Sequence, residues 1–417
     1  MVEADRYRSC EVVVVGCGAI GLPLALAFAG QGRSVVGVDA DPRRASDLSS
    51  ANVESDPERL DLRLRETADR LRFTGAVPQS PAPRAFVLAV STPADGAGRF
   101  RDSDLKAAAQ SVVSRARDGD LVVIRSTVPI GTTRALATGL DPGGRLLWAS
   151  CPDRSFAGRA LADQLAIPHI VGGLTPAAAA AARELFADLC AVVEVGAPET
   201  AEAAKLFLNV ERDMRFAVAN QFALICEQTG VDYSEARRAA AQGSDFRLAR
   251  PGPVGGPCLE KDAYLLLASP GLGGTGELLA LGRGLNAGLA SRLAEQILAE
   301  TQAPRRVAIL GLAFKGSPPV TNRAGSFGLA LGQALTALDP SVEVDWWDPV
   351  SDPPSARQAV LSGAAVVVLA NEHPDLADLA GIATCVPSAI VHDLCGVTLG
   401  LQVPAGLRVR VFGDGAQ

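Results

Sequence analysis

The feature that most constrains the fold is a glycine-rich turn that joins a buried strand to an apolar helix. Residues 11–15 (Glu-Val-Val-Val-Val) predict a parallel strand that is covered on both faces. Residues 16–21 follow with the spacing G-x-G-x-x-G and lead into an apolar helix over residues 22–29. A second strand over residues 34–38 ends at Asp39. This order of elements is typical of a dinucleotide-binding α/β domain.

Each part of this turn has a physical role in binding a dinucleotide. Glycines let the backbone approach the pyrophosphate, which lies at the N-terminus of the helix. Asp39 would accept hydrogen bonds from the ribose hydroxyls of NAD and would repel a 2′-phosphate. We therefore predict NAD as the cofactor, bound by Gly16, Gly18, Ala19, Ile20, Gly21 and Asp39.

The rest of the chain predicts two α/β lobes with a helical section between them. In the first lobe, short apolar segments predict further strands of a doubly wound sheet, at residues 85–90, 121–124, 146–149 and 169–171. Helical periodicity with little β-branching then runs from Thr200 to about Glu300. A second, Rossmann-like α/β pattern starts at Arg305 without the G-x-G-x-x-G spacing, and its predicted strands are residues 307–314, 342–347 and 364–370. The predicted domains are residues 1–196, 197–301 and 302–417.

Composition argues against several other classes of protein. The formal net charge of −7 disfavours nucleic-acid binding, which needs a basic face. No apolar run reaches the ~18 residues of a membrane span and no signal peptide is visible, so we expect a cytoplasmic protein without a membrane partner. The eight cysteines include no C-x-x-C pair, so no metal site is predicted, and most cysteines are expected to be free and buried.

The candidate for covalent chemistry is Cys258, in the segment Pro251-Gly-Pro-Val-Gly-Gly-Pro-Cys-Leu-Glu-Lys-Asp262. A thiol beside glycines, with a lysine and an aspartate one turn later, has the surroundings of an activated nucleophile. A loop with a small buried cysteine is the alternative that this segment alone leaves open. Lysine is otherwise scarce, and three of the four lysines fall within motifs: Lys205, Lys261 and Lys315, with Lys106 as the fourth.

Several motifs occur in a fixed order along the chain. After the glycine turn come Ser91-Thr-Pro93, Ser126-Thr-Val-Pro-Ile-Gly-Thr-Thr133, Cys151-Pro-Asp-Arg154, Glu202-x-x-Lys205-x-x-x-Asn209, Gly255-Gly-Pro-Cys258-x-x-Lys-Asp262 and Gly311-Leu-Ala-Phe-Lys315 with Arg323. This series resembles the nucleotide-sugar 6-dehydrogenases of the UDP-glucose/GDP-mannose dehydrogenase family, over about residues 11–395. The Pro-Asp-Arg segment with Ile167-Pro-His-Ile-Val-Gly-Gly173 looks closer to the UDP-N-acetylhexosamine branch.

The resemblance implies a four-electron, NAD-dependent oxidation of the C6 alcohol of a nucleotide sugar to the carboxylate. Cys258 would trap the intermediate aldehyde as a thiohemiacetal, and a second hydride transfer would give a thioester that water hydrolyses. Lys205 and Asn209, one helical turn apart, would stabilise the negative C6 oxygen, although their spacing alone also fits a solvated helix face. Asp262, with Thr127 as its neighbour, would position the water for proton transfer.

The resemblance also implies contacts with the cofactor, the substrate and a second subunit. Thr92 and Thr127 follow apolar strands and would line the cofactor site, a role compatible with helix capping. The last lobe would bind the nucleotide diphosphate, and its cations suit phosphate unless they form surface salt bridges. A homodimer is expected through the central helices. The substrate-binding residues implied in this way are Arg154, Lys205, Asn209, Gly255, Gly256, Lys261, Phe314, Lys315 and Arg323.

The chain departs from the family pattern at Asp153, where a glutamate is usual and is thought to aid thioester hydrolysis. A side chain shorter by one methylene would hold the carboxylate back from the water, and a displacement of that order can cost ~10²-fold in rate. Pro257 and the segment Val320-Thr-Asn322 are also unusual. Together these differences favour an unusual substrate or a specialised biosynthetic pathway.

Three other activities remain open on the sequence. A two-electron dehydrogenase of the β-hydroxyacid type would not need Cys258. An oxidase of a nucleoside or nucleotide would act on a primary alcohol that mimics the sugar C6. A nucleotide-sugar-binding protein without catalysis would explain Asp153 as decay, but the presence of Cys258, Lys205, Asn209 and Asp262 argues against it.

Overall fold

The structure is a computed structural model that describes residues 11–53, 58–79, 84–94, 99–243, 245, 248–272, 274–301 and 306–415 of the chain. Three sequence predictions lie outside these ranges: the absence of a signal peptide, the state of Cys10 and the start of the second lobe at Arg305. The chain forms two compact units, divided within helix α9 between Leu208 and Asn209 and again within helix α11 between Ala263 and Tyr264. The predicted division into three domains stays a prediction.

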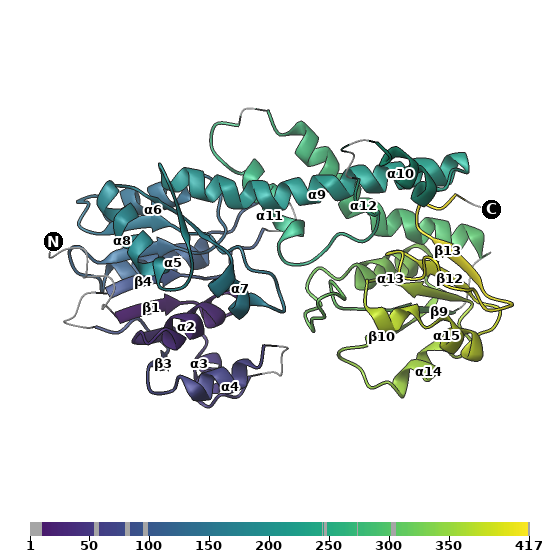
Figure 1. Ribbon diagram of the computed structural model, residues 1–417, viewed down its shortest axis with the longest axis horizontal. Coiled ribbons are helices and arrows are strands. Elements are labelled where there is room, and N and C mark those ends of the chain that lie inside the picture. Colours follow the sequence, from purple (N-terminus) through teal and green to yellow (C-terminus); the bar gives the residue numbers. More distant parts are fainter. Residues whose placement is uncertain are drawn as a thin grey trace. The chain divides into compact units, whose positions relative to one another are not determined.

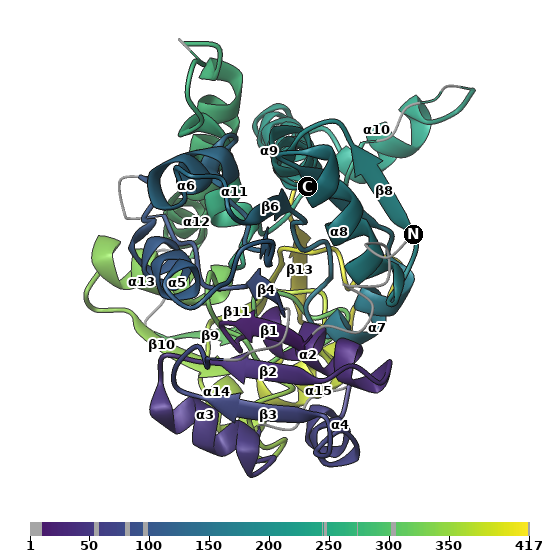
Figure 2. The same cartoon turned by 90° about the vertical axis from the view of Figure 1, so that its left-hand side faces the viewer.

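An eight-stranded sheet organises the first unit, and its strand order is β3-β2-β1-β4-β5-β6-β7-β8. Neighbouring strands are parallel except for the antiparallel pair of β6 and β7. Figure 2 shows β3, β2, β1 and β4 side by side. In such a doubly wound sheet the order reverses between β1 and β4, and ligands bind at the carboxyl ends of the strands there. The strands are β1 (Glu11–Val15), β2 (Val35–Val38), β3 (Leu71–Thr74), β4 (Arg84–Leu88), β5 (Leu121–Ile124), β6 (Leu147–Ser150), β7 (His169–Gly173) and β8 (Val192–Val195).

Helices cover this sheet because its inner strands are apolar on both sides. Strand β5 is buried at all four positions, as a parallel strand between two helical layers must be. Helix α2 is apolar all round and is buried from Gly21 to Ala29. The helices of the first unit are α2 (Gly21–Gly30), α3 (Pro42–Ser49), α4 (Leu60–Glu66), α5 (Ser103–Val113), α6 (Thr132–Leu140), α7 (Ala160–Ala166) and α8 (Pro176–Ala187).

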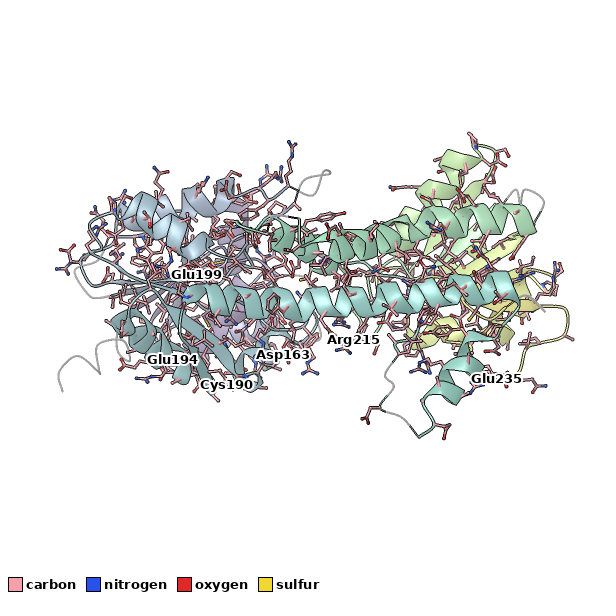
Figure 3. All side chains as sticks on the ribbon, turned by 90° about the horizontal axis from the view of Figure 1, so that it is seen from above. Asp163, Cys190, Glu194, Glu199, Arg215 and Glu235 are labelled. Atoms are coloured by element: carbon pink, nitrogen blue, oxygen red, sulfur yellow. The ribbon has the colours of Figure 1, made fainter. Side chains whose placement is uncertain are left out.

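The central part of the chain is helical, as predicted, but the described residues between 241 and 258 are not helical and interrupt it. Its helices are α9 (Pro198–Thr229), α10 (Tyr233–Ala240), α11 (Leu259–Leu267) and α12 (Glu277–Glu300). Helix α9 has 32 residues and is drawn as one continuous rod in Figures 1 and 3, with Glu199 in its first turn. The glycines and prolines of residues 251–257 cannot continue a helix, which explains the interruption.

A five-stranded parallel sheet organises the second unit, in the order β10-β9-β11-β12-β13. This order is the second common arrangement of a doubly wound sheet. Its strands are β9 (Arg306–Leu310), β10 (Glu343–Trp347), β11 (Val366–Leu369), β12 (Ile390–Asp393) and β13 (Arg408–Val411). The helices around it are α13 (Phe327–Leu338), α14 (Ala356–Leu361), the 3-10 helix η1 (Pro374–Ala377) and α15 (Leu379–Cys385).

The predicted α/β architecture is confirmed, whereas several local expectations were incomplete. Strands β3, β8, β12 and β13 were not predicted, and β8 is an edge strand whose residues are exposed or half-buried. The expectation that most cysteines are buried was wrong. Among the described cysteines only Cys17 and Cys151 are buried, and Cys258 is exposed. No helix in the described part of the chain has both the length and the hydropathy that crossing a bilayer requires.

The three glycines of the turn after β1 face three different surroundings. Gly16 has a φ of +91°, and a Cβ there would lie 2.7 Å from the carbonyl oxygen of Ala89. A Cβ on Gly21 would lie 1.7 Å from the carbonyl oxygen of Gly16. A Cβ on Gly18 would have no atom within 4 Å. The first and third glycines are therefore required by packing within the turn, and the second leaves open space above the backbone.

We predict that Gly21→Ala and Gly18→Ala separate folding from cofactor binding. Gly21→Ala should destabilise the protein by about 3 kcal/mol, because backbone atoms must move to admit the methyl group. Gly18→Ala should change the free energy of unfolding by less than about 0.5 kcal/mol, yet weaken NAD⁺ binding about tenfold by filling the approach to the pyrophosphate. Urea unfolding and NAD⁺ titration calorimetry measure the two effects, and an unchanged affinity of Gly18→Ala would contradict the prediction.

Candidate functional site

The predicted cofactor residues lie together at the carboxyl ends of β1 and β2. Asp39 accepts a hydrogen bond from the backbone amide of Cys17 at 3.0 Å and another from that of Asp41 at 3.0 Å. These bonds fix the carboxylate beside the glycine turn, while Asp39 stays partly exposed. The residues present fit NAD, because the open backbone at Gly18 and the fixed Asp39 stand where a pyrophosphate and a ribose are held in this fold. Other exposed or partly exposed residues of the turn are Ala19 and Ile20.

The thiol of Cys17, in the middle of this turn, is not available for chemistry. Its Sγ lies 3.7 Å from the carbonyl oxygen of Val38 and 3.9 Å from that of Val14. Burial, helped by the charge of Asp39, raises the pKa of this thiol to about 12. Cys17 therefore packs beneath the turn as a small apolar residue.

In the second sheet, the turn after β9 corresponds to the glycine turn of the first sheet, and the side chain of Asp348 occupies it. Asp348 follows β10 as Asp39 follows β2, but it is completely buried. Its Oδ2 accepts hydrogen bonds from the amides of Leu312 at 2.7 Å and Ala313 at 2.8 Å, in the turn after β9. Its Oδ1 accepts from the amides of Val350 at 3.0 Å and Ser351 at 3.2 Å, so this buried carboxylate has no accessible lone pair left for ribose hydroxyls. The geometry agrees with the sequence, in which only the first lobe has the dinucleotide spacing.

Thr92 and Thr127 lie in neighbouring loops at the switch point of the first sheet. The Thr92 hydroxyl donates to the backbone oxygen of Thr127 at 2.7 Å, and Thr92 is buried. Ser126 adds a hydroxyl bond to the backbone oxygen of Val90 at 2.7 Å. These bonds join the loops that follow β4 and β5. Thr127 is half-buried, so its own side chain remains at the surface of the joined loops.

Glu202 on α9 holds the next part of the same loop, a function that the sequence did not reveal. Its carboxylate accepts hydrogen bonds from the amide of Gly131 at 2.6 Å and from the amide and hydroxyl of Thr133 at 2.9 and 2.6 Å. These amides belong to the start of α6, where a negative charge is favourable. Burial nevertheless raises the pKa of Glu202. Lys205, one turn further along α9, is buried as well.

Asp153 is a buried anion with every oxygen engaged. Its Oδ1 accepts from Arg125 Nη2 and Gln164 Nε2, both at 2.9 Å, and its Oδ2 accepts from the amide and hydroxyl of Ser155 at 3.2 and 2.6 Å. Burial acts to raise the pKa of Asp153, but the charge of Arg125 and these hydrogen bonds outweigh it and hold the pKa below the ordinary value. A carboxylate in this state is a weak base.

The side chains around the Arg125–Asp153 ion pair make contacts that stabilise the fold. His169, which begins β7 as predicted, is buried, and burial followed by the charge of Arg125 lowers its pKa to about 3. A histidine that stays neutral in this way does not act as an acid at neutral pH. Arg154 donates to the backbone oxygen of Pro168 at 3.1 Å and remains partly exposed.

Cys258 lies at the N-terminus of α11. Its backbone oxygen accepts from the amides of Lys261 at 3.1 Å and Asp262 at 2.9 Å, so the helix begins at this residue. The side chain is exposed. A helix N-terminus favours negative charge, and a thiol there is favoured as the thiolate. The position at the helix terminus is a property that the loop sequence did not predict.

Two of the predicted residues, Asn209 and Lys261, contact a third, Asp262, which lies four residues after Cys258. Asn209 Nδ2 donates to Asp262 Oδ2 at 2.5 Å, and Lys261 Nζ lies 2.7 Å from Asp262 Oδ1. Asp262 is buried, whereas Asn209 and Lys261 are half-buried. Asp262 is thus an anion shared between an amide and an ammonium.

The glycines before Cys258 pack against the loop before α13, within the second unit. The amide of Gly256 donates to the backbone oxygen of Gly325 at 3.0 Å, and a Cβ on Gly255 would lie 2.0 Å from that same oxygen. A Cβ on Gly256 would meet the Phe314 ring at 2.5 Å. Close approach of these backbones explains why two glycines are needed.

The two predicted phosphate-binding cations lie on this lobe. Arg323 is exposed, and its Nη2 lies 3.4 Å from Asp352 Oδ1. An exposed ion pair of this kind contributes little to stability. Lys315 Nζ lies 5.9 Å from the centre of the Phe314 ring. Arg323 can therefore turn to a ligand at small cost.

Comparison with known proteins agrees with this geometry. The chain matches the NAD-binding domain of the UDP-glucose/GDP-mannose dehydrogenase family over residues 10–190. It matches the central domain of the same family over residues 199–282. Two matched domains of one family in the right order cover more than half of the chain.

Several relatives match over nearly their full length. A UDP-N-acetyl-D-mannosamine dehydrogenase of Pyrococcus horikoshii is 31% identical, with 97% of this chain and 99% of the relative covered. An NDP-N-acetyl-D-galactosaminuronic acid dehydrogenase of Ralstonia nicotianae is 29% identical, with 87% and 90% covered. The solved structure of a UDP-D-ManNAc dehydrogenase from Pyrococcus horikoshii has a TM-score of 0.85 at 30% identity, covering 97% of this chain and 99% of that one. The chain belongs to the UDP-glucose/GDP-mannose dehydrogenase family and is an NAD-dependent nucleotide-sugar dehydrogenase.

Proposed function

We propose that this enzyme oxidises the C6 alcohol of a UDP-N-acetylhexosamine to the uronic acid in the cytoplasm, where NAD⁺ is available. The names of the relatives support this substrate class, since they include dehydrogenases of UDP-N-acetyl-D-mannosamine and of an N-acetylgalactosaminuronic acid nucleotide. The observation that carries the proposal is the exposed Cys258 at the N-terminus of α11, four residues before the Asp262 carboxylate that binds Asn209.

The four-electron oxidation needs a covalent stage, and Cys258 provides it. NAD⁺, held by the glycine turn and Asp39, would supply the hydride acceptor that each of the two oxidations at C6 needs. The Cys258 thiolate forms a C–S bond to the aldehyde carbon that the first oxidation leaves, and the hydroxyl of this thiohemiacetal becomes the thioester carbonyl in the second. Water then attacks the thioester carbon, the C–S bond breaks, and the acid leaves with the thiol restored.

Lys205, Asn209, Asp262 and Thr127 are proposed to handle oxygen and protons during these steps. The Lys205 ammonium and the Asn209 amide, one turn apart on α9, are donors for the negative oxygen of the tetrahedral intermediates. Asp262 is proposed to hold the water, with Thr127 as its neighbour. The Lys261 ammonium lies 2.7 Å from Asp262 Oδ1 and supplies a counter-charge beside the proposed water.

The substrate is proposed to bind with its diphosphate toward the cations of the second α/β lobe. Lys315 and Arg323 supply positive charge for the phosphates. Phe314 and the glycine pair of residues 255–256 give a close-packed wall beside them. Further proposed contacts are those of Arg154 and Lys261.

A homodimer is proposed through α9, because this helix is exposed on its apolar side. Val218, Phe222 and Ile225 are each more than 40% exposed, and their spacing of four and three residues places them on one stripe. Leu278 and Leu281 of α12 are about 75% exposed. Contiguous apolar surface of this kind marks a protein interface.

Replacing the proposed nucleophile tests the four-electron reaction. With a UDP-N-acetylhexosamine, the wild-type enzyme should form two NADH per substrate and a product heavier by one oxygen and lighter by two hydrogens. Cys258→Ser should lower product acid at least 10³-fold, because the aldehyde is no longer captured as a thiohemiacetal that can be oxidised to the thioester. Cys385→Ser, at a partly buried position on α15, is the control. Full acid formation by Cys258→Ser would instead favour a dehydrogenase that needs no thiol.

Asp153 is proposed to be a structural anion and not the base for hydrolysis. Asp153→Asn should retain two NADH per substrate and should leave no acyl group on Cys258, as measured by intact-protein mass. The variant should lose about 3 kcal/mol of stability at pH 7, since Arg125 is left without its counter-charge. This difference from wild type should disappear as the pH falls well below 3.8, where the wild-type carboxylate with its lowered pKa also becomes protonated. Accumulated acyl-enzyme would contradict the proposal.

Charge on the exposed stripe of α9 should break the dimer. Phe222→Asp is expected to shift the sedimentation coefficient from that of a dimer to that of a monomer, because burying an unpaired carboxylate costs several kcal/mol. Glu211→Asp, at an exposed position earlier on the same helix, is the control. A wild-type protein that sediments as a monomer at micromolar concentration would refute the interface.

A further inference from the structure

The loop that carries Cys258 is held at both ends by buried side chains of α9 and α12. At its start, Asn220 Oδ1 accepts from the amide of Gly252 at 2.7 Å, and Asn220 Nδ2 donates to the backbone oxygen of Gly252 at 3.1 Å. At its end, Arg283 Nη1 donates to the backbone oxygen of Leu259 at 3.0 Å. Leu259 is the residue directly after Cys258.

These two anchors belong to one hydrogen-bonded network. Asn220 Nδ2 also donates to Asn286 Oδ1 at 3.0 Å. Asn286 Nδ2 donates to Asp213 Oδ1 at 2.8 Å, and Arg283 Nη1 donates to the same oxygen at 2.7 Å. All four side chains are at most 2% exposed. The network therefore links the beginning and the end of the Cys258 loop through a single carboxylate oxygen.

The helices approach each other closely where this network lies. A Cβ on Gly282 would lie 2.5 Å from the Met214 sulfur, so a larger residue there would have to displace the Met214 side chain where α12 packs on α9. Met214 and Gly282 are the direct neighbours of Asp213 and Arg283. The two charges are thus enclosed at a tight helix contact with little freedom to move.

Stability alone is a poor explanation for this ion pair. Taking two charges out of water is costly, and apolar residues of similar volume often serve a fold equally well. Moreover, only one carboxylate oxygen of Asp213 is hydrogen-bonded, because its Oδ2 is buried and has no hydrogen-bond partner among the described residues. What an apolar pair could not supply is the hydrogen bond from Arg283 to the Leu259 carbonyl.

We propose that Asp213 and Arg283 are positioning residues that fix where the Cys258 sulfur stands. Asp213 orients the guanidinium, and the guanidinium holds the first residue of α11 and with it the helix N-terminus that carries the thiol. The inference rests on the proposed role of Cys258 as nucleophile. A displacement of the order of 1 Å at a reacting atom costs about 10²-fold in rate, so the anchor is large enough to matter.

The test separates positioning from folding by a pair of variants. Arg283→Met should lower both the melting temperature and kcat, since it leaves the Asp213 charge buried and alone. Asp213→Leu combined with Arg283→Met should recover the melting temperature, because no charge remains to be buried. Its kcat should stay about 10²-fold below wild type with KM changed less than threefold, because Leu259 still lacks its anchor. Recovery of wild-type kcat by the double variant would overturn the proposal.

A second measurement does not depend on catalysis. The rate of alkylation of Cys258 by iodoacetamide, followed by peptide mass spectrometry from pH 6 to 10, should fall about tenfold below pH 8 in the double variant. Arg292→Met, at an exposed position of α12, should match wild type. An unchanged alkylation profile in the double variant would also overturn the proposal. If Cys258→Ser retains full acid formation, the proposed nucleophile fails, whereas the alkylation profile still decides whether the anchor positions the thiol.

Discussion

Helix α9 buries several polar side chains on the face that also packs its apolar residues, and the proposed chemistry depends on these buried polar groups. Glu202, Lys205, Asp213 and Asn220 are all buried, and with Asn209 they fall within about 80° of one another at about 100° per residue. The opposite face carries exposed Val218, Phe222 and Ile225. Glu202, Asp213 and Asn220 are each hydrogen-bonded to a specific group on another element. Figure 3 shows this helix with Glu199 and Arg215 labelled along it.

The buried groups of α9 act mainly on backbone, and this is how one helix arranges loops that are distant in sequence. Glu202 bonds the amides at the start of α6, and Asn220 bonds both polar groups of Gly252. Asp213 acts through Arg283 on Leu259. Loops rich in glycine and proline form few regular hydrogen bonds of their own, so side chains supply them. The cost of burying these polar groups is offset by the order that they impose on the loops.

The sequence predicted those features that depend on residues near one another in the chain. The valine strand β1, the glycine turn and Asp39 form one local unit, and β5 was predicted with its observed bounds. The sequence did not predict that Arg125 would neutralise Asp153, or that Arg283 would reach Asp213, since these pairs are 28 and 70 residues apart. Neither periodicity nor spacing records such contacts. The edge strand β8 was missed because its exposed residues give no buried pattern.

The placement of Cys258 at a helix terminus was only partly predictable from the sequence. Glycine, proline and a following acidic turn are signals for a helix start, and α11 does begin with Glu260 and Asp262 in its first turn. What the local pattern could not indicate is that Asp262 would be shared by Asn209, which is 53 residues away. The chemistry of the site therefore rests on tertiary contacts more than on the motif that drew attention to it.

The turn after β9, which Asp348 occupies, determines when the coenzyme must be exchanged during the reaction. Because Asp348 fills that turn with its own carboxylate, the described residues offer one dinucleotide cradle for two successive oxidations. Spent coenzyme must consequently be exchanged midway through each catalytic cycle. During that interval the half-oxidised sugar has to stay on the enzyme, and the proposed covalent bond to the Cys258 sulfur would hold it where reversible binding alone would let a reactive aldehyde diffuse away.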